Sequence, residues 1–360
     1  MRGFVTVAFA LAVFALSSPA VGGSRWFVAA NGTDSATCGG KKEPCRTITA
    51  AMANALDGDT VEVGPGRYGD LNANGVLGEA EEEAPLACGC VVSLTKSLRL
   101  QSSAGAAVTV IEAGGAPFGV RMESTDGVLG RSGRGFTIRG AGSTGVEVRG
   151  SRNRVEGNLA TQNGNFGFRV MSSDAVLVGN TAVGNPLSGI FVSSGPGATL
   201  IGNRSFGSQT GFLVLADEST LTGNVASGNS GNGFHLSGSG HRFERNVANG
   251  NGEAGLFVQN AASAESIVGN AFVGNGGPGL RLIGPVSEIS RNNIFGNDPS
   301  GNCGVLNQTD LVVQMTKNFW GAASGPGANP ADDVCNLVFS TTSVGPVAKK
   351  PFKVKLKAPK

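Results

Sequence analysis

Five positions between residues 70 and 81 carry oxygen ligands at the spacing of a calcium-binding loop. The segment reads Asp-x-Asn-x-Asn-Gly-x5-Glu, with a carboxylate at the first and twelfth positions. Calcium prefers such carboxylate, amide and backbone carbonyl oxygens. The sequence therefore predicts a structural Ca²⁺ site formed by Asp70, Asn72, Asn74, the carbonyl of Val76, and Glu81. Because no paired helices flank the segment, a solvated acidic surface loop is the alternative.

Histidine is the side chain best suited to proton transfer near neutral pH, and the chain contains 2 of them. His241 is followed by Arg242 and Glu244, and we expect Glu265, one repeat later, to stand at the position that matches His241. A base beside charged groups could act on an acidic sugar, but surface charges also pair without any catalytic role. We assign no catalytic set. The candidates are His235, His241, Arg242, Glu244 and Glu265.

A third set of side chains recurs once in each repeat and could form a contact surface. The repeat carries a Gly-apolar-any-apolar motif whose third position points outward if the motif is a strand. That position reads Glu147 and then Arg169, Phe191, Leu213, His235, Phe257 and Arg281. Exposed apolar patches mark contact sites, and neighbouring arginines suit a glycan that carries acidic groups. An interface with another protein chain remains an alternative.

The C-terminal tail offers a different explanation for the same surface. Residues 352–357 alternate apolar and basic side chains, so they could lie over the outward positions as a strand and bury Val354 and Leu356. In that arrangement the apolar positions would be covered by the chain itself. Alternatively, the lysines of the tail could hold an acidic polymer or a membrane surface.

The elements that would position these residues follow from an internal repeat. The glycine motif begins at residues 145, 167, 189, 211, 233, 255 and 279, and one asparagine register follows it at residues 158, 180, 203, 224, 246, 270 and 292. Five residues after each comes a second asparagine, with Ser208 as the exception. Helical repeats are excluded, because several Gly and Asn in 22 residues cannot form two amphipathic helices. The period-two motifs predict about seven stacked coils with asparagine columns at the turns.

The repeats resemble those of the pectin-lyase-like superfamily. Two flanking segments strengthen the resemblance: residues 26–68, with Gly58-Asp59-Thr60 and Pro65-Gly66-Arg67-Tyr68, and the segment Asn318-Phe319-Trp320-Gly321. The resemblance implies an all-β fold, a single-stranded right-handed parallel β-helix, with a short capping helix at residues 48–56. The sequence lacks the Asp-Pro-His-Asp, Gly-His-Gly and Asp-His motifs of enzymes with this fold. We therefore expect binding of carbohydrate or a cell-surface partner, with a lyase or epimerase of uronic-acid polymers, or a structural adhesion protein, as alternatives.

The domain organisation follows from the two ends of the chain. Residues 1–22 contain Arg2, an apolar stretch and Ser18-Pro19-Ala20, which is typical of a signal peptide. We expect a cap and first coils at 23–104 with an inserted loop at 70–90, repeats at 105–300, and a C-terminal cap with a basic tail at 301–360. The protein is then exported to the periplasm, cell surface or medium, without a transmembrane segment, and is expected to be a monomer.

Six cysteines in an exported chain predict disulfides. Cys38 with Cys45 and Cys303 with Cys335 are the expected pairs, whereas Cys88 and Cys90 stand so close that cross-pairing or free thiols are alternatives. The formal net charge is +2, and no basic aromatic sheet face is evident, which disfavours nucleic acid as a partner.

Overall fold

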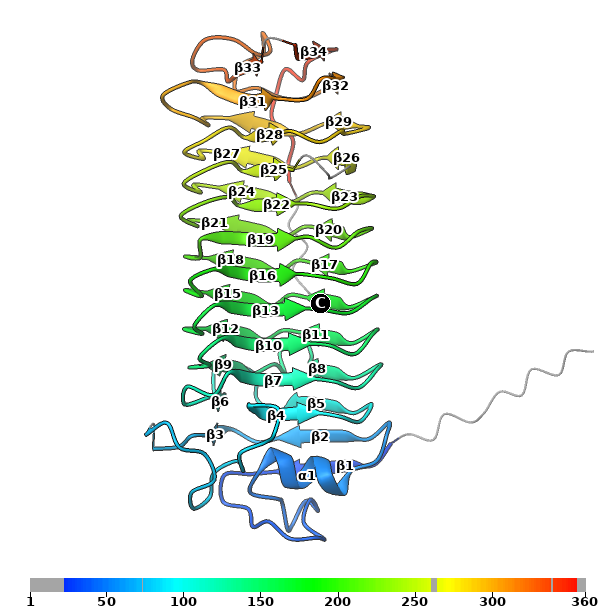
Figure 1. Ribbon diagram of the computed structural model, residues 1–360, viewed down its shortest axis with the longest axis vertical. Helices are drawn as coiled ribbons and strands as arrows, with labels where there is room; N and C mark the ends of the chain where they lie inside the picture. Colours follow the sequence, from blue (N-terminus) through cyan, green and yellow to red (C-terminus); the bar gives the residue numbers. More distant parts are fainter. Residues whose placement is uncertain (1–22, 73, 260–263, 338, 355–360) are drawn as a thin grey trace, which may run out of the picture.

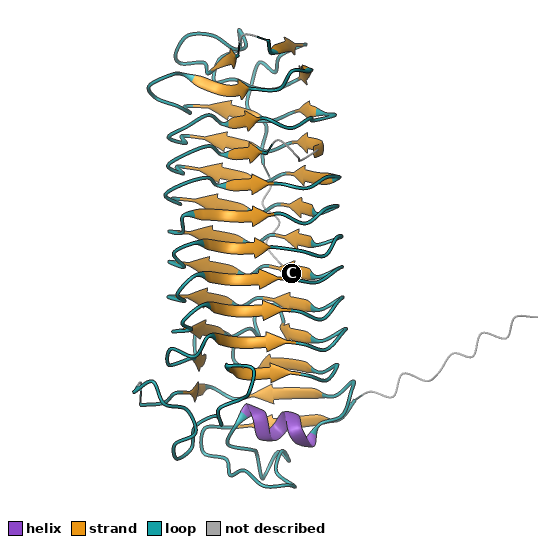
Figure 2. Ribbon diagram, in the orientation of Figure 1, coloured by secondary structure: helices purple, strands orange, loops and turns teal. Residues whose placement is uncertain are grey.

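The computed structural model describes residues 23–354 except 73, 260–263 and 338, and these residues wind into a tall parallel β-solenoid (Figure 1). Three parallel sheets of 13, 10 and 11 strands, here called sheets A, B and C, form its walls. Figure 2 shows how nearly all of the column is strand and turn, with one short helix at its N-terminal end. The predicted all-β fold class is thereby confirmed, while the expected signal peptide lies outside the described residues.

The strands of each sheet follow one another up the column. Sheet A contains β1 (Arg25–Val28), β2 (Thr60–Val63), β5 (Arg99–Ser102), β8 (Val128–Gly130), β11 (Arg154–Glu156), β14 (Val176–Val178), β17 (Thr199–Ile201), β20 (Thr220–Thr222), β23 (His241–Glu244), β26 (Ala264–Val268), β29 (Ile289–Ser290), β32 (Val312–Thr316) and β34 (Thr341–Val344). Sheet B contains β3 (Gly66–Gly69), β6 (Thr109–Glu112), β9 (Thr137–Arg139), β12 (Leu159–Thr161), β15 (Thr181–Val183), β18 (Arg204–Phe206), β21 (Val225–Ser227), β24 (Val247–Asn249), β27 (Ala271–Val273) and β30 (Asn293–Phe295). Sheet C contains β4 (Cys90–Leu94), β7 (Phe118–Met122), β10 (Thr144–Val148), β13 (Phe166–Val170), β16 (Ser188–Val192), β19 (Thr210–Val214), β22 (Phe234–Leu236), β25 (Leu256–Val258), β28 (Leu280–Leu282), β31 (Cys303–Asn307) and β33 (Asp333–Asn336).

Each regular coil contributes one strand to each sheet, and equivalent residues of successive coils lie in register. Val146 pairs with Phe168, which pairs with Ile190, at the 22-residue spacing read from the sequence. The solenoid has more coils than the seven motifs predicted. Residues 119–122 carry one further copy of the glycine motif, and other coils near the two ends keep the strand register with an incomplete motif. Their inward residues, such as Val120 and Val305, are as fully buried as those of the repeats.

The interior is a set of apolar columns, one beneath each sheet. The inward positions of the glycine motifs are fully buried from Val146 to Leu282, and so is the sheet A column from Val155 to Ile267. The rings of Phe212 and Phe234 stack at 4.7 Å, and Phe243 meets Phe234 edge to face at 4.8 Å. Burial of a large apolar side chain stabilises a fold by about 1.5–3 kcal/mol, so these columns supply the main driving force for folding.

The first asparagine column forms a continuous ladder between sheets A and B. In each rung the Oδ1 of one asparagine accepts two hydrogen bonds from the asparagine one coil earlier, one from its backbone amide and one from its Nδ2. The Oδ1 of Asn203 accepts both of these bonds from Asn180 at 3.0 Å. The Nδ2 of Asn203 also donates to the Leu177 carbonyl at 2.9 Å. The ladder runs from Asn158 through the predicted positions and extends to Asn318. These amides are buried, so the ladder satisfies backbone groups that water cannot reach.

The second column lies between sheets B and C and is interrupted once. Asn163 donates to Asn185 at 3.0 Å, and Asn229 donates to Asn251 at 2.9 Å, but Ser208 stands between the two segments. The buried hydroxyl of Ser208 has no hydrogen-bond partner in the described part of the chain. At the far end Asn297 donates its side-chain amide to Asp332 at 2.8 Å, so a carboxylate terminates the column.

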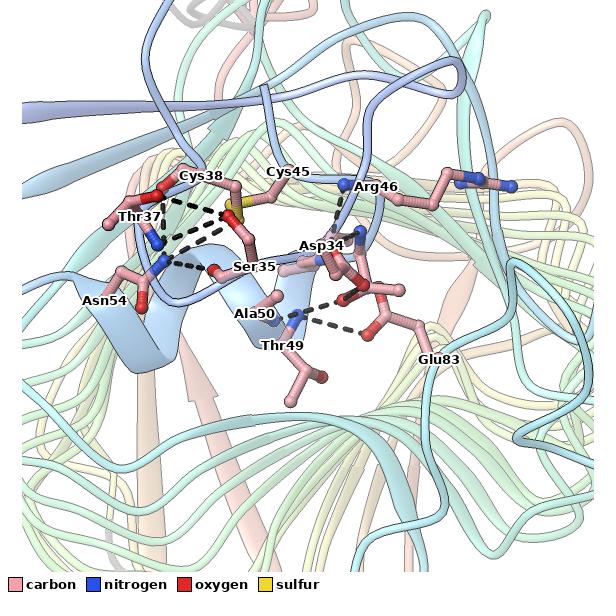
Figure 3. The surroundings of a disulfide bond; sticks show 12 residues. Asp34, Ser35, Thr37, Cys38, Cys45, Arg46, Thr49, Ala50, Asn54 and Glu83 are labelled. Carbon is pink, nitrogen blue, oxygen red and sulfur yellow. Dashed lines mark hydrogen bonds between the residues drawn. A yellow bond between two sulfur atoms is a disulfide. The ribbon is translucent and has the colours of Figure 1, made fainter. Parts of the chain in front are cut away.

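A short helix, α1 (Ile48–Asn54), covers the N-terminal end of the core, as predicted. Its first turn is held by two carboxylates (Figure 3): Asp34 accepts from the amide of Thr47 at 2.9 Å, and Glu83 accepts from the amide of Thr49 at 3.1 Å. Glu83 is fully buried, and burial raises the pKa of its carboxyl group although the helix amides oppose the shift. At the other end of the helix, Lys96 donates to the carbonyl of Ala55 at 2.6 Å.

All six cysteines are paired in the structure. The predicted bonds Cys38–Cys45 and Cys303–Cys335 are confirmed, and the second joins the neighbouring strands β31 and β33. Cys88 and Cys90 are bonded to each other, so the cross-pairing and free-thiol alternatives are wrong. Within the described residues no helix is long and apolar enough to cross a membrane.

The two asparagine columns predict opposite changes in stability: a substitution that breaks the first column should destabilise the fold, and one that completes the second should stabilise it. Asn203→Ala removes four buried hydrogen bonds and leaves the Asn180 amide unpaired, so we expect a loss of at least about 3 kcal/mol in unfolding free energy. Ser208→Asn completes the second column and should stabilise the fold by about 1 kcal/mol. Urea unfolding followed by circular dichroism measures both. An unchanged midpoint for Asn203→Ala would contradict the structural role of the ladder.

Candidate functional site

The outward positions of sheet C form one vertical column, here called the outer stripe, made of Arg169, Phe191, Leu213, His235, Phe257 and Arg281. Strand pairing sets each member directly beside the next, on β13, β16, β19, β22, β25 and β28. Their strand neighbours point inward and are buried, whereas the six side chains are partly exposed. The alignment expected from the repeat is confirmed, and the ligand role of the stripe stays a prediction.

Rings and guanidinium groups contact one another along the outer stripe. Phe191 packs against Phe166 at 5.0 Å, and the guanidinium of Arg169 lies over the Phe191 ring at 5.7 Å. Further up the column, His235 and Phe257 lie 4.6 Å apart, and Arg281 lies over Phe257 at 5.0 Å. These contacts hold the side chains against one another. The stripe therefore presents aromatic and apolar faces between two fixed positive charges.

Glu147, which the sequence placed in the exposed column, is instead fully buried. Three arginines surround its carboxylate: Arg149 at 2.7 Å, Arg121 at 3.1 Å and Arg169 at 3.7 Å. The expectation of an exposed glutamate is wrong because long guanidinium side chains from the same and adjacent coils close over it. A buried carboxylate with several guanidinium partners fixes the orientation of the arginines around it.

The arginines around Glu147 belong to a wider positive region. Residues 119–170 contain eight arginines against four carboxylates, whereas residues 171–280 contain three arginines against six carboxylates. Arg121 also contacts Glu123 at 3.2 Å and lies over the Phe118 ring at 5.0 Å. The side chains of Arg149 and Arg169 remain 43% and 30% exposed, so part of this charge faces solvent beside the outer stripe.

The basic tail does not begin on the outer stripe. Phe352 exchanges two hydrogen bonds of 2.8 Å with the side chain of Asn293, which belongs to β30 in sheet B. The tail was expected to cover sheet C, but up to Val354 the described chain is attached to a different wall of the solenoid. Leu356, the other residue expected to be buried, lies outside the described residues. The described part of the tail therefore gives no cover to the stripe.

A hollow of about 320 Å³ adjoins the C-terminal end of the outer stripe. It is lined by Asn232, Gly252, Glu253, Ala254, Gly277, Pro278 and Arg281. Asn232 donates to the carboxylate of Glu253 at 2.8 Å, and Arg281 donates to Gln308 at 2.8 Å. The hollow thus offers polar groups of both signs beside the ring faces, which suits the hydroxyl and amide groups of a sugar.

The catalytic candidates do not converge on one site. His241 is fully buried on the core side of β23, with its Nε2 3.1 Å from the Ser237 carbonyl oxygen. Arg242 and Glu244 alternate to the outer face of the same strand. The expected match to Glu265 is wrong, because a bulge pairs His241 with Ala264 and Arg242 with Ser266. The Glu265 side chain lies outside the described residues.

His235 is the one catalytic candidate on the outer stripe. Its Nε2 lies 2.8 Å from Oε1 of Gln259, and burial against its neighbours lowers the pKa of the ring below the ordinary value. A neutral imidazole beside ring faces could accept a proton from a sugar. Its ring contacts Phe257 and Gln259, neither of which is an acid or a base, whereas the nearby carboxylate of Glu253 favours the charged form of the imidazole and so opposes the shift of its pKa.

The predicted calcium ligands are only partly brought together. Asp70 is buried, and its Oδ2 accepts from the Gly75 amide at 2.8 Å. Asn72 and Asn74 both donate to Glu79, and their oxygens accept backbone amides within the loop. Glu81 is 73% exposed and lies 3.9 Å from Arg46, so it does not face Asp70 as the loop pattern expects. Val76 is also exposed.

Elsewhere in the described chain, one group of three side chains that could bind a metal lies close together. It consists of Asp34, Cys38 and Cys45. Because the two sulfurs are bonded to each other, they supply no thiolate, and the carboxylate of Asp34 is occupied by the amides of Arg46 and Thr47. This group is therefore a structural cap (Figure 3) rather than a metal site.

Comparison with known proteins supports the architecture. The family described as right handed beta helix region matches residues 119–272. Among solved structures, the A-module of mannuronan C-5 epimerase AlgE6 from Azotobacter vinelandii aligns with a TM-score of 0.52 and 18% identity over 85% of this chain and 94% of that one. The AlgE4 A-module of the same organism gives 0.51 and 15% over 84% and 90%. Pectate lyase Pel9A gives 0.50 and 18% over 91% and 78%.

At these identities the likeness is one of fold. The chain is a right-handed parallel β-helix that shares its winding with these proteins. The search of curated protein sequences gives no match.

The buried His241 makes stability depend on pH. Burial lowers its pKa below 6.5, so the unfolded chain takes up a proton at a pH where the folded protein resists it. Stability is therefore present above the ordinary pKa and is lost as pH falls. We expect the wild type to lose more stability between about pH 7 and pH 5 than His241→Gln does. The raised pKa values of Glu83 and Asp332 act in the opposite direction but equally in both proteins. Parallel pH slopes of the two melting temperatures would contradict this assignment.

Proposed function

We propose that this right-handed parallel β-helix binds an extended acidic polysaccharide along its outer stripe and does not cleave it. The observation that carries the proposal is a column of partly exposed rings with arginine at each end. Arg169 and Arg281 are held over Phe191 and Phe257, so the cations and the ring faces are prearranged. A prearranged site loses little side-chain entropy when its ligand binds.

The dimensions of the outer stripe suit a polymer better than a small molecule. Its six members lie on successive coils, and at the strand spacing of about 4.8 Å they extend over roughly 24 Å. The apolar faces of sugar rings can pack on Phe191, Leu213 and Phe257. The charged groups of the same polymer can then reach Arg169 and the exposed side of Arg149 by charge-assisted hydrogen bonds.

The structural neighbours support the choice of polymer class by analogy of fold. Two of these neighbours are named as mannuronan epimerases and one as a pectate lyase, and both mannuronan and pectate carry carboxylates. For this chain a carboxylated polysaccharide agrees with the positive region at residues 119–170. A location outside the cytoplasm is also part of the proposal. Three disulfides are typical of an oxidising compartment, and the sequence predicts a signal peptide at residues 1–22.

A lyase or epimerase is the second candidate function, and His235 is the observation that favours it. Its lowered pKa keeps the imidazole neutral, as a general base requires. Against catalysis, the carboxylate of Glu253, which acts on the charge of His235, already accepts a hydrogen bond from Asn232, and the carboxylate of Glu147 is enclosed by arginines. We therefore place binding first.

The proposal predicts how binding responds to substitution. We expect Phe191→Ala and Arg169→Gln each to weaken binding of alginate or polygalacturonate about tenfold, which corresponds to 1.4 kcal/mol. The arginine variant should also reduce the salt dependence of the affinity, because one ion pair is lost. Affinity electrophoresis and calorimetry with size-defined oligomers measure both effects.

Matched controls lie on another wall of the same solenoid. Phe206→Ala and Arg204→Gln change the same residue types on the outer face of β18 in sheet B, and they should leave the affinity unchanged. Equal losses from both pairs of variants would mean that binding is unspecific, and no binding by the wild type would refute the proposal. If the ultraviolet absorbance of unsaturated products rises, or the ratio of uronic acid epimers changes, and His235→Gln abolishes the change, the enzymatic alternative replaces it.

A further inference from the structure

We propose that Asp70 and Glu82 bind a Ca²⁺ ion that ties together two parts of the segment 70–90 and thereby holds Glu83 against the N-terminal cap of the solenoid. Both residues belong to the loop between β3 and β4, where the sequence pattern pointed to Glu81. The structure favours its neighbour Glu82 as the second carboxylate. This site lies among the first coils, away from the outer stripe, and does not depend on the function proposed for that surface.

Two buried oxygen atoms carry the proposal. Asp70 is 1% exposed and Glu82 is 7% exposed. Within the described residues, the Oδ1 of Asp70 and the Oε2 of Glu82 are buried and accept no hydrogen bond. A carboxylate oxygen that is removed from water without a partner is costly, so buried carboxylates normally have a cation or several donors.

The carboxylate of Glu82 reaches the backbone next to Asp70 at the base of the loop. The Oε1 of Glu82 accepts from the amide of Leu71 at 2.8 Å, which is the residue that follows Asp70. The Oδ2 of Asp70 accepts from the amide of Gly75 at 2.8 Å, so the loop folds back over the same place. In each residue one oxygen is fixed by the loop backbone, and the other remains free to bind a cation.

Neither carboxylate has a positive side chain to neutralise it in the described structure. The ion pairs recorded there include none with Asp70 or Glu82, and Arg46 lies 3.9 Å from Glu81 instead. Gly114 of the next coil lies against Asp70, since a Cβ at that glycine would come within 2.3 Å of Oδ2. Buried carboxylates without a counter-charge are costly, and a bound cation would supply that charge to both residues.

The donor set indicates Ca²⁺ as the cation. The free groups at the site are carboxylate oxygens, which hard cations prefer, and no imidazole or free thiol belongs to the segment 70–90. An irregular loop cannot impose the strict octahedron that Mg²⁺ demands, whereas Ca²⁺ accepts six to eight oxygens in variable geometry. Water and loop carbonyls can complete that number.

The position of Glu82 gives the ion a structural consequence. The next residue, Glu83, accepts the amides of Ile48 and Thr49 at the start of α1. Holding Glu82 in place therefore also holds Glu83 under the helix that covers the open end of the core. Ca²⁺ would stabilise the cap through this connection, and its removal would loosen the cap first.

The test measures Ca²⁺ binding and stability in the full chain. We expect CaCl₂ to raise the melting temperature over that in EDTA, and Tb³⁺ bound as a substitute to be sensitised by Tyr68, the sole tyrosine of the chain, two residues before Asp70. Glu82→Gln and Asp70→Asn should each weaken binding by more than about tenfold, since even outer-shell changes cost that much. Glu81→Gln is the matched control and should bind as the wild type does.

Stability in EDTA separates a ligand from a residue that is merely structural. If Glu82 is a ligand, Glu82→Gln removes a buried charge without a counter-charge from the metal-free protein and melts in EDTA at or above the wild-type temperature, yet gains nothing from CaCl₂. Loss of binding in Glu81→Gln but not in Glu82→Gln would overturn the proposal in favour of the loop pattern. Absence of any calcium effect on the wild type would also overturn it.

Discussion

The buried asparagine ladders are the constraint on which the rest of the molecule depends. Each side chain must accept from one coil and donate within the stack, so every rung requires the next coil to place an asparagine at the same height. When a coil has one residue more or fewer, the difference in length must be taken up by a turn that lies away from the asparagine column. The coil between Asn246 and Asn270 is 24 residues long and still keeps the bond, at 2.8 Å from the Asn246 amide. The ladders thereby impose register on strands that apolar packing alone would let slip.

Fixed register has a chemical consequence on the outside of the solenoid. Because inward side chains stack, the outward ones stack as well, and a single strand position becomes a column of contacts. On sheet C this brings Arg121, Glu147 and Arg169 from three coils into one cluster, although 26 and 22 residues separate them along the chain. The same register lines up the rings above them. The surface is therefore assembled by repetition, and its binding properties follow from which residues occupy one motif position.

The sequence predicted the features that depend on periodicity and missed those that depend on side-chain reach. The sheets, the asparagine columns and the outward alignment all follow from spacing. The burial of Glu147 does not, because it results from arginine side chains that fold over the strand. The bulge between β23 and β26 leaves Glu265 without a partner in the strand register, so counting a fixed number of residues from His241 gives the wrong neighbour. The closure of Cys88 with Cys90 and the burial of Glu82 beside an exposed Glu81 depend on loop geometry, for which the repeat offers no guide.

The direction of the bonds in the second asparagine column explains why a carboxylate stands at its C-terminal end. Each bond between asparagines runs from an amide in an earlier coil to the Oδ1 of an asparagine in a later one, so the final acceptor needs no donor of its own. A carboxylate only accepts, and Asp332 occupies that place by taking the backbone and side-chain amides of Asn297 at 3.1 and 2.8 Å. An aspartate within the column could not pass the bond onward and would break it. The N-terminal end of the core also needs acceptors, but for another reason: the first amides of the capping helix have no partner within the helix, and Asp34 and Glu83 receive them. Acidic residues thus close both ends of the core, each by accepting hydrogen bonds that no further coil can take.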